Sequence, residues 1–441
     1  MPTTNRARRW LAGLIPELPG PAWTLVSVHG LANLAGGILW AFLVVYLHFV
    51  RDISLGVSGV ALATVPLAAM IVGPVAGTLA DRISPRLVIA GGGALAASGA
   101  AALGGVTAAW QAIVVALVLG AGFTCMESPT YTLLAVAVPK ERRSAIFALD
   151  YAMLAAGWGS GGFIGGLLVD IHHADTFQAA FLLAAALYLV FAAVVLRVAP
   201  RAAAASGAPP AGAPDPHAGF RGYRIVLADR SMRRIVAVSV VLLAASYSQF
   251  DVTFPAVAIG DAHVGTKVIG LAFLANMLTI VLGQLVILRL LEGRRRTRAM
   301  ILMCCFSGAC WLAVLFAAHI GGGLPAALAL IVAFVIVAFA EMTWSPSVPG
   351  MVNDLAPAEL RGRYNATDAF AESGGRLIGP VIGGFALGAG FTDAWLVAIV
   401  VVSLASVAIV VDLERVVPDS ANRVGPGGHE FETGSPPPTV L

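Results

Sequence analysis

Residues 139–166 read PKERRSAIFALDYAMLAAGWGSGGFIGG, and residues 357–384 read PAELRGRYNATDAFAESGGRLIGPVIGG. The two stretches align without a gap, so that a leading proline, an arginine, the acids Asp150 and Asp368 and a series of glycines keep the same register. Chance does not account for so many matches over so short a length. The chain therefore carries an internal repeat, and we expect it to fold as two related halves.

The glycines of the repeat are expected to lie where helices meet. Residues spaced by four fall on one face of a helix, and helices in a bilayer associate through close packing of small residues. With one proline, the set comprises Gly157, Gly161, Gly165, Gly166, Gly375, Gly379, Pro380, Gly383 and Gly384. Ordinary packing explains each glycine taken singly, whereas the paired set indicates interfaces at which helices rock.

The composition is that of a membrane protein. Hydrophobic residues make up 59% of the chain and charged residues only 12%, and the mean hydropathy is +0.87. A soluble domain of this size needs far more polar surface, so lipid must cover most of the outside. The net charge of +3 is small and its basic residues are scattered, which argues against a nucleic-acid partner.

About 20 apolar residues are needed for a helix to cross the hydrocarbon core. Twelve stretches meet this length, and the predicted fold is all-α, with twelve transmembrane helices in two pseudo-symmetric six-helix bundles. The predicted spans are residues 23–49, 58–80, 87–107, 110–137, 144–169, 177–197, 234–259, 266–290, 299–319, 325–353, 363–389 and 392–412. We expect helices 1, 4, 7 and 10 to line a central cavity.

A Pro/Ala/Gly-rich stretch at residues 200–217 separates the halves, and a short amphipathic helix is expected from Phe220 to Met232. The predicted organisation is a cytoplasmic N-terminus (1–22), an N-terminal bundle (23–198), a cytoplasmic linker (199–233), a C-terminal bundle (234–412) and a disordered cytoplasmic tail (413–441).

Positive residues near helix ends are retained on the cytoplasmic side of a membrane. With an inward N-terminus, only Arg51 and Lys267 fall in outer loops, and Arg289 and Arg376 lie within spans. Both termini are therefore expected to be cytoplasmic. The scarcity of lysine beside arginine suits a GC-rich bacterial genome, which predicts a multi-pass protein of the bacterial inner membrane.

The loop at residues 77–86, GTLADRISPR, resembles the signature of the major facilitator superfamily, G-x-L-A-D-R-x-G-R-[KR]. The matching residues are Gly77, Asp81, Arg82 and Arg86. Ser84 and Pro85 depart from the signature, which alters the turn but keeps its charge pattern. In the family, the acid at the position of Asp81 helps to hold one conformation by interacting near the start of helix 11. In this sequence, Arg361 and Arg363 are the partners expected for Asp81.

From Leu355 the chain resembles the helix 10–11 connection of bacterial drug exporters, within the twelve-helix drug/proton antiporters. Helix 5 is similar to their glycine motif, with Gly162 in place of its proline, whereas helix 11 keeps Pro380. Ala116 stands where helix 4 of the family often carries an arginine that assists proton coupling. The resemblance implies proton-driven export, with coupling arranged differently.

An ionised side chain at the bilayer centre is costly, so such residues usually face a cavity or a partner. Glu127 and Glu341 lie inside helices 4 and 10, on the same helix face in the repeat alignment. They either line the cavity or form a polar contact between helices. The proton-coupling candidates are Glu127, Glu341, Glu372, Asp368 and Asp150.

Asp368, Glu372 and Arg376 are spaced by four and form one stripe along helix 11. A salt bridge between Glu372 and Arg376 is one reading of this stripe. Asp368 and its repeat partner Asp150 lie near the cytoplasmic edge. Either residue could serve as a proton site or in an ion pair between the halves.

Aromatic and polar residues within spans could form an adaptable pocket for hydrophobic substrates, and ordinary packing is the alternative for each. The substrate-cavity candidates are Asn33, Trp40, Tyr247, Phe250, Asp251, Trp344 and Arg376. For Asp251, solvation at the outer end of helix 7 is the simpler explanation. The adjacent His172 and His173 are expected to be solvated, and no metal site is predicted.

These features predict a secondary active transporter, a proton-coupled exporter of small hydrophobic or amphiphilic compounds that works by alternating access. A lipid or lysolipid flippase and a metabolite uptake permease are the alternatives. The sequence lacks the nucleophile and metal motifs of an intramembrane enzyme. We expect a monomer without cofactors whose partners are a small-molecule substrate, protons and membrane lipids.

Overall fold

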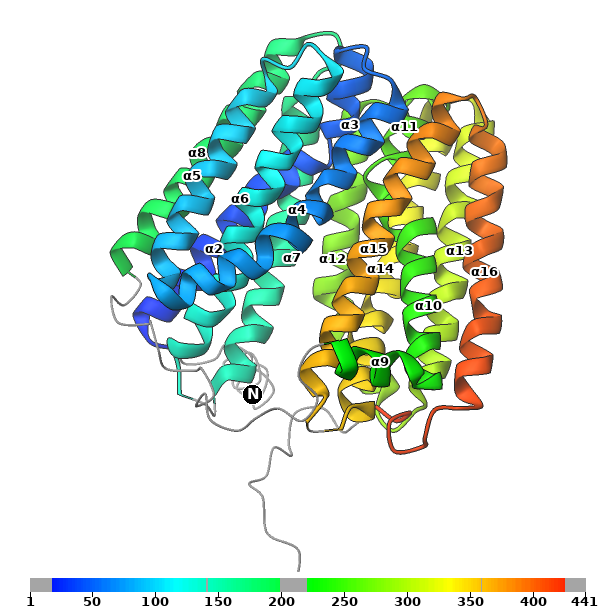
Figure 1. The fold of residues 1–441 in the computed structure, drawn as a ribbon. Helices are drawn as coiled ribbons and strands as arrows, with labels where there is room; N and C mark the ends of the chain where they lie inside the picture. Colours follow the sequence, from blue (N-terminus) through cyan, green and yellow to red (C-terminus); the bar gives the residue numbers. More distant parts are fainter. Residues whose placement is uncertain (1–17, 140–141, 199–219, 358, 425–441) are drawn as a thin grey trace, which may run out of the picture.

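The computed structural model describes residues 18–139, 142–198, 220–357 and 359–424. The predicted linker 199–219 and most of the predicted N-terminal segment lie outside this part of the chain. Most of the described residues are helical, and the predicted all-α fold of two helical bundles is confirmed (Figure 1).

The N-terminal bundle begins with a broken helix and continues with five long ones. Its elements are α2 (Gly20–Trp40), α3 (Leu43–Val45), η1 (Tyr46–Val50), α4 (Leu55–Arg82), α5 (Pro85–Leu103), α6 (Ala109–Val136), α7 (Arg143–Leu168) and α8 (Ala174–Val198). The C-terminal bundle follows the same plan after one short helix. Its elements are α9 (Phe220–Ala228), α10 (Arg230–Ala245), η3 (Tyr247–Phe250), α11 (Thr253–Gly260), α12 (Thr266–Leu291), α13 (Arg296–Ile320), α14 (Gly323–Leu355), α15 (Arg361–Gly388) and α16 (Thr392–Glu414).

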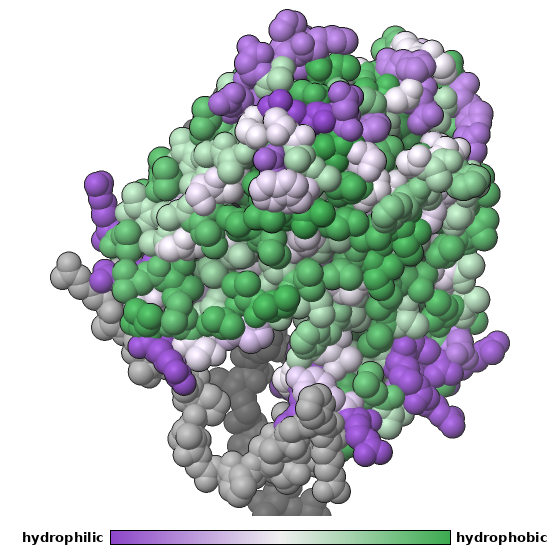
Figure 2. All heavy atoms as spheres, turned by 45° about the horizontal axis from the view of Figure 1, so that its top comes forward, coloured by the Kyte–Doolittle hydropathy of each residue, from purple (hydrophilic) through white to green (hydrophobic). Residues whose placement is uncertain are grey.

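Ten of the described helical segments are long and apolar enough to cross a membrane. α7 and α15, which carry the internal repeat, occupy the two remaining predicted positions; their glycines and charges lower their hydropathy. The face in Figure 2 is apolar through its middle and hydrophilic towards the ends. Large apolar side chains lie on the surface, and that of Leu282, for example, is 76% exposed. Such exposure is unfavourable in water but not in lipid.

The first transmembrane helix of each bundle is interrupted at the same place, although helix 7 already leaves the α-helical conformation at Ser246. α2 gives way to α3 at Ala41 and Phe42, and η3 gives way to α11 at Asp251 and Val252. The correspondence follows from packing, because Gly157 of α7 lies against Gly30 and Leu34, and its repeat partner Gly375 lies against Val240 and Ala244. Residues of helix 1 therefore map onto residues of helix 7 in one constant register.

The repeated glycines divide into two groups. The first three of each copy lie against the first helix of their own bundle, as Gly161 does on Leu34 and Gly379 on Ala244. The last glycine of each copy contacts the opposite bundle, where Gly166 meets Gly270 and Gly384 meets Gly56. Both inter-bundle contacts lie at the end of the molecule that carries α3 and α11, which we call the α11 end.

The two bundles meet at the α11 end and diverge towards the end that carries α9, the α9 end (Figure 1). At the α11 end, the hydroxyl of Thr266 donates to the carbonyl oxygen of Val169 across the interface, over 2.8 Å. Phe49 of η1 lies beside Gly260 of α11 in the same region.

The segment after α16 is ordered as far as Val424 and packs on the turn between α12 and α13. The backbone N–H of Arg296 donates to Asn422 O over 2.8 Å, and that of Thr297 donates to Asn422 Oδ1 over 3.0 Å. The predicted start of a disordered tail at residue 413 is therefore too early, because these polar contacts hold residues 413–424. Residues 425–441 lie outside the described part.

Candidate functional site

Two adjoining cavities, of about 280 Å³ and about 290 Å³, lie where the bundles diverge. Both are lined by Tyr151 of α7, Tyr247 of η3, Glu341 of α14 and Arg376 of α15. The space is thus shared by one helix of the N-terminal bundle and several of the C-terminal bundle. α10 with η3 and α14 line it as predicted for helices 7 and 10, but α2 and α6 supply no lining residue.

The charged groups of the cavities come from three elements. Glu341 lies near the middle of α14, with the side chains of Asn276 and Tyr247 beside its carboxylate. The Arg376 guanidinium lies 4.7 Å from the centre of the Tyr247 ring. Glu372 lines the first cavity and Asp251 the second. Glu372 and Arg376 interact electrostatically, but no salt bridge between them is present among the described residues.

Asp251 reaches the cavity because the helix breaks there. Ser246, at the start of the break, accepts a hydrogen bond from the Trp311 indole N–H over 2.9 Å. The short η3 turn that follows directs Tyr247 and Asp251 towards α14 and α15. The structure thus places Asp251, one of the substrate-cavity candidates, in the wall of the second cavity, and the simpler explanation by solvation at the outer end of its helix does not apply.

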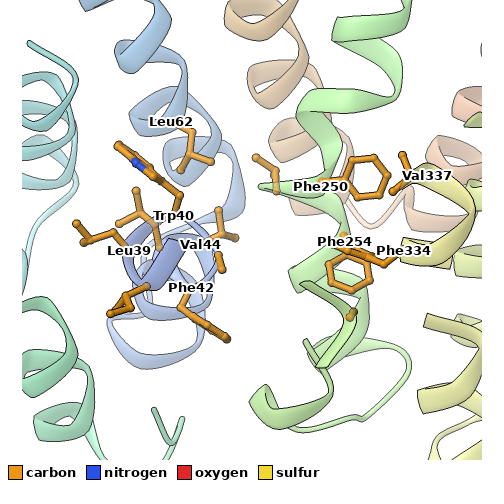
Figure 3. Close-up of a cluster of buried hydrophobic side chains, with 14 of the residues drawn as sticks. Leu39, Trp40, Phe42, Val44, Leu62, Phe250, Phe254, Phe334 and Val337 are labelled. Carbon is orange, nitrogen blue, oxygen red and sulfur yellow. The ribbon is translucent and has the colours of Figure 1, made fainter. Parts of the chain in front are cut away.

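Aromatic rings form the wall of the second cavity. Phe250 lies 5.2 Å from Phe334 between ring centres, and Phe273 lies 4.9 Å from Phe334. Figure 3 draws Phe250 and Phe334 apart from Trp40, which lies with Leu39 and Leu62 in the N-terminal bundle. Trp40 is a core residue and lines neither cavity, whereas Trp344 lines the first one.

A second polar cluster lies inside the N-terminal bundle. His29 Nδ1 is 2.8 Å from Asp150 Oδ1, and His29 Nε2 is 3.0 Å from Glu127 Oε1. The three side chains come from α2, α7 and α6. We call them the His29 triad. Glu127 therefore takes the second predicted role, a polar contact between helices, and lines neither cavity.

Asn33, one helical turn after His29, also has a structural role. Its amide donates to the His29 carbonyl over 2.9 Å, and its Oδ1 accepts from the Trp158 indole N–H over 3.0 Å. Asn33 is buried and does not line a cavity, but it positions Trp158, which does.

Among its described residues, the C-terminal bundle has no equivalent of the His29 triad. In the packing register above, Ser239 replaces His29, Asp368 replaces Asp150, and the repeat alignment places Trp344 opposite Glu127. Ser239 lies beside Asp368, yet the Ser239 hydroxyl and Asp368 Oδ1 are buried without a hydrogen-bond partner. Neither Asp150 nor Asp368 forms an ion pair between the bundles among the described residues.

The signature loop lies at the α9 end. Asp81, Arg82 and Arg361 are exposed there, and Arg363 lies against Gly222 of α9. Among the salt bridges of the described residues, none joins Asp81 to α15. Gly77 has open space around it, and Arg86 is half-buried.

His29 was not among the site residues predicted from the sequence. His29 stands in the apolar stretch WTLVSVHGLANLAGG. An ionisable side chain in such a stretch is costly to bury, whether it is an acid or a histidine, and this cost was the signal that could have identified it. Three acid or histidine side chains meet in the triad, but no group of described residues has the arrangement of a metal site.

The family profile of the Major Facilitator Superfamily matches residues 25–380 and 236–432, which is most of the chain. The chain belongs to the major facilitator superfamily. It is therefore a multi-pass membrane protein of a transporter family, which confirms the resemblance found in the signature loop.

Solved structures of superfamily transporters have the same fold at low sequence identity. A nucleoside transporter, NupG, superposes with a TM-score of 0.74 at 13% identity, covering 90% of this chain and 100% of that one. A POT family transporter in complex with 5-aminolevulinic acid gives 0.73 at 13% identity, covering 91% and 99%. A peptide transporter POT gives 0.69 at 17% identity, covering 93% and 99%. No curated protein matches the sequence.

Proposed function

We propose that this superfamily member is a secondary active transporter that carries a small organic molecule by alternating access, with the paired cavities as its substrate site. The observation that carries the proposal is the position of Glu341 and Arg376. Both charges face a space shared by the two bundles, near the middle of α14 and α15. A substrate bound there would be released to one side or the other as the bundles rock.

The cavity chemistry favours a molecule with an aromatic or apolar body and a polar, often positively charged, group. Among the described lining residues are three carboxylates, those of Glu341, Glu372 and Asp251, and one guanidinium, that of Arg376. Aromatic rings supply the remaining wall and bind flat apolar groups. Export of hydrophobic or amphiphilic compounds fits this site.

An uptake permease is the second candidate. The structures of similar fold include nucleoside and peptide transporters, whose substrates are small and polar. A polar solute could use Arg376 and Glu341 together as a pair of opposite charges. The direction of net transport separates the two candidates.

We place the α9 end in the cytoplasm. Helix ends there carry basic residues such as Arg82, Arg197 and Arg298, and the opposite loops carry only Arg51 and Lys267 among their described residues. Both termini are then cytoplasmic, in a bacterial inner membrane, and the structure is an inward-facing state. In the outward-facing state, we propose that Asp81 pairs with Arg361 or Arg363 as the α9 ends close.

Proton coupling is proposed to use buried carboxylates. Glu341 and Glu372 face the cavities, where a bound substrate and a proton would compete for the same carboxylates. Three other acids lie deeper within the bundles: Asp368, Asp150 and Glu127. Gain or loss of a proton by these acids would change the contacts between helices. Helix 4 has Ala116 at the position where the family often carries an arginine. Proton coupling would therefore depend on these acids without help from that cation.

The test is transport into proteoliposomes by the purified protein, with a panel of aromatic cations, nucleosides and dipeptides. Each compound is assayed with and without a pH gradient of either sign. We expect gradient-driven accumulation of at least one class, and Glu341→Gln to abolish it while Glu359→Gln, an exposed control, does not. Absence of transport for every class, or wild-type rates in Glu341→Gln, would contradict the proposed site.

A further inference from the structure

His29 offers both of its ring nitrogens to carboxylates inside the N-terminal bundle. It is 2% exposed, as is Asp150, whereas the side chain of Glu127 is 20% exposed. From the helices packed on α2, the titratable groups around His29 are Glu127 and Tyr131 of α6, Asp150 of α7 and Tyr188 of α8. No arginine or lysine is among these described groups, so the imidazole is the group that offsets the charge of the two acids.

The geometry fixes how many protons this cluster holds. A nitrogen–oxygen contact of 2.8 or 3.0 Å needs a hydrogen between its atoms. Either an imidazolium donates to two carboxylates, or a neutral imidazole donates to one and accepts from a carboxylic acid. Both arrangements hold two protons and leave one net negative charge. Loss of a proton would set a bare nitrogen against a carboxylate, and gain of one would remove the net charge.

We propose that His29, Glu127 and Asp150 form a single proton-binding site, separate from the substrate cavities, whose charge sets how α2 is held between α6 and α7. Glu127, the exposed member, takes one proton from water and becomes a neutral acid; releasing it restores the carboxylate. His29 allows the bound protons to shift between Glu127 and Asp150. The ion-pair contact between His29 and Glu127 weakens when the added proton removes the charge of Glu127, whereas the contact between His29 and Asp150 keeps its charges.

α2 can transmit this change. It continues through the break at Ala41 and Phe42 into α3 and η1, whose Phe49 lies beside Gly260 of the opposite bundle. α2 is also in direct backbone contact with α7, because Gly157 and Gly161 of α7 have no side chain to separate the two helices. A small change of α2 at His29 therefore reaches the contact between the bundles at the α11 end.

The site is confined to one bundle. Ser239 and Trp344 take the places of His29 and Glu127 in the C-terminal bundle, so the substrate charges and the triad charges lie in different halves. Binding of the proton does not depend on the proposed function; its use in transport does.

The experiment needs no substrate. Spin labels are attached at Arg197→Cys and Arg298→Cys, both exposed at the α9 end of opposite bundles, in protein whose four native cysteines are replaced. Distance distributions are measured from pH 5 to pH 9 in nanodiscs. We expect the wild-type distribution to change with pH, and the change to fall at least fivefold in His29→Gln and Asp150→Asn. The matched control is His48→Gln, because His48 bonds to Ile53 outside the triad.

Glu127→Gln gives a second test that does not require loss of a signal. The amide is uncharged at every pH, so this variant should keep the low-pH distribution of the wild type throughout. A pH-independent wild type, a full response in His29→Gln, or a high-pH distribution in Glu127→Gln would overturn the proposal. Failure of the proteoliposome assay would instead overturn the proposed function and leave these distances unaffected.

Discussion

The guanidinium of Arg376 lies over the ring of Tyr247, 4.7 Å from its centre. The contact joins α15 to the break in helix 7, and it holds beside Glu341 the one cationic side chain among the described residues that line the cavities. Such contacts are worth about 0.5–1 kcal/mol when exposed and more when desolvated. Moving the Arg376 guanidinium off the Tyr247 ring when a substrate binds would therefore cost little free energy.

We expect Arg376→Gln to reduce transport at least tenfold while changing thermal stability little, because the guanidinium is exposed to the cavity. Tyr247→Phe keeps the ring and should retain most of the activity, whereas Tyr247→Leu should not. Initial rates in proteoliposomes and thermal unfolding in detergent provide the two readouts. Equal loss of activity in Tyr247→Phe and Tyr247→Leu would show that the hydroxyl, and not the ring, matters.

Gly384 allows α15 to meet α4 at the α11 end, because a Cβ there would collide with the carbonyl of Leu55. Overpacking of this kind costs about 1–3 kcal/mol. Gly384→Ala should therefore shift the equilibrium away from the state closed at the α11 end, by about fivefold or more at 1.4 kcal/mol per factor of ten. Spin labels at Thr107→Cys and Asp261→Cys would report a longer distance.

The control for this substitution is Gly374→Ala on the same helix, since a Cβ at Gly374 has open space around it. It should leave the distance unchanged. If both variants behave alike, the close contact with Leu55 does not determine the closed state.

Asp81→Asn should slow transport and leave folding intact, since Asp81 is exposed in this state and is expected to pair with α15 only in the other. Without that pair the outward-facing state loses stability, and the distances at the α9 end should stay long under all conditions. Asp354→Asn is an informative comparison, because Asp354 already pairs with Arg296 here, over 2.6 Å. An unchanged distance distribution in Asp81→Asn would count against this role.

Asn422→Ala should lower the stability of the C-terminal bundle by about 1–3 kcal/mol, because the buried Thr297 N–H loses its acceptor. Thermal unfolding of the detergent-solubilised protein measures the effect. Asp419→Asn is the control: the Asp419 side chain is 79% exposed and 3.8 Å from Arg295, so little change is expected. A similar melting temperature in Asn422→Ala and wild type would exclude a structural role for the segment after α16.

The positions of the helices were readable from the sequence, because a chain in lipid must satisfy its backbone hydrogen bonds within each helix. The internal repeat was readable too, since glycines that permit close packing cannot be replaced freely without loss of contact. Glu341 and Arg376 stood out because charges in an apolar span are costly, and the structure places both at the cavities.

Only the tertiary structure decided which polar groups meet. Glu127, Asp150 and His29 come from three helices, and their contact depends on how each helix is rotated, which close backbone packing at Gly157 and Gly161 sets. Hydropathy does not report that rotation, so the sequence left Glu127 between a cavity and a polar contact between helices, and His29 was not singled out. Likewise, Pro255, four residues after Asp251, disfavours a continuous helix at the break, but only the packing of α10 and α11 on α13 and α15 decided that the break turns Asp251 towards the cavity.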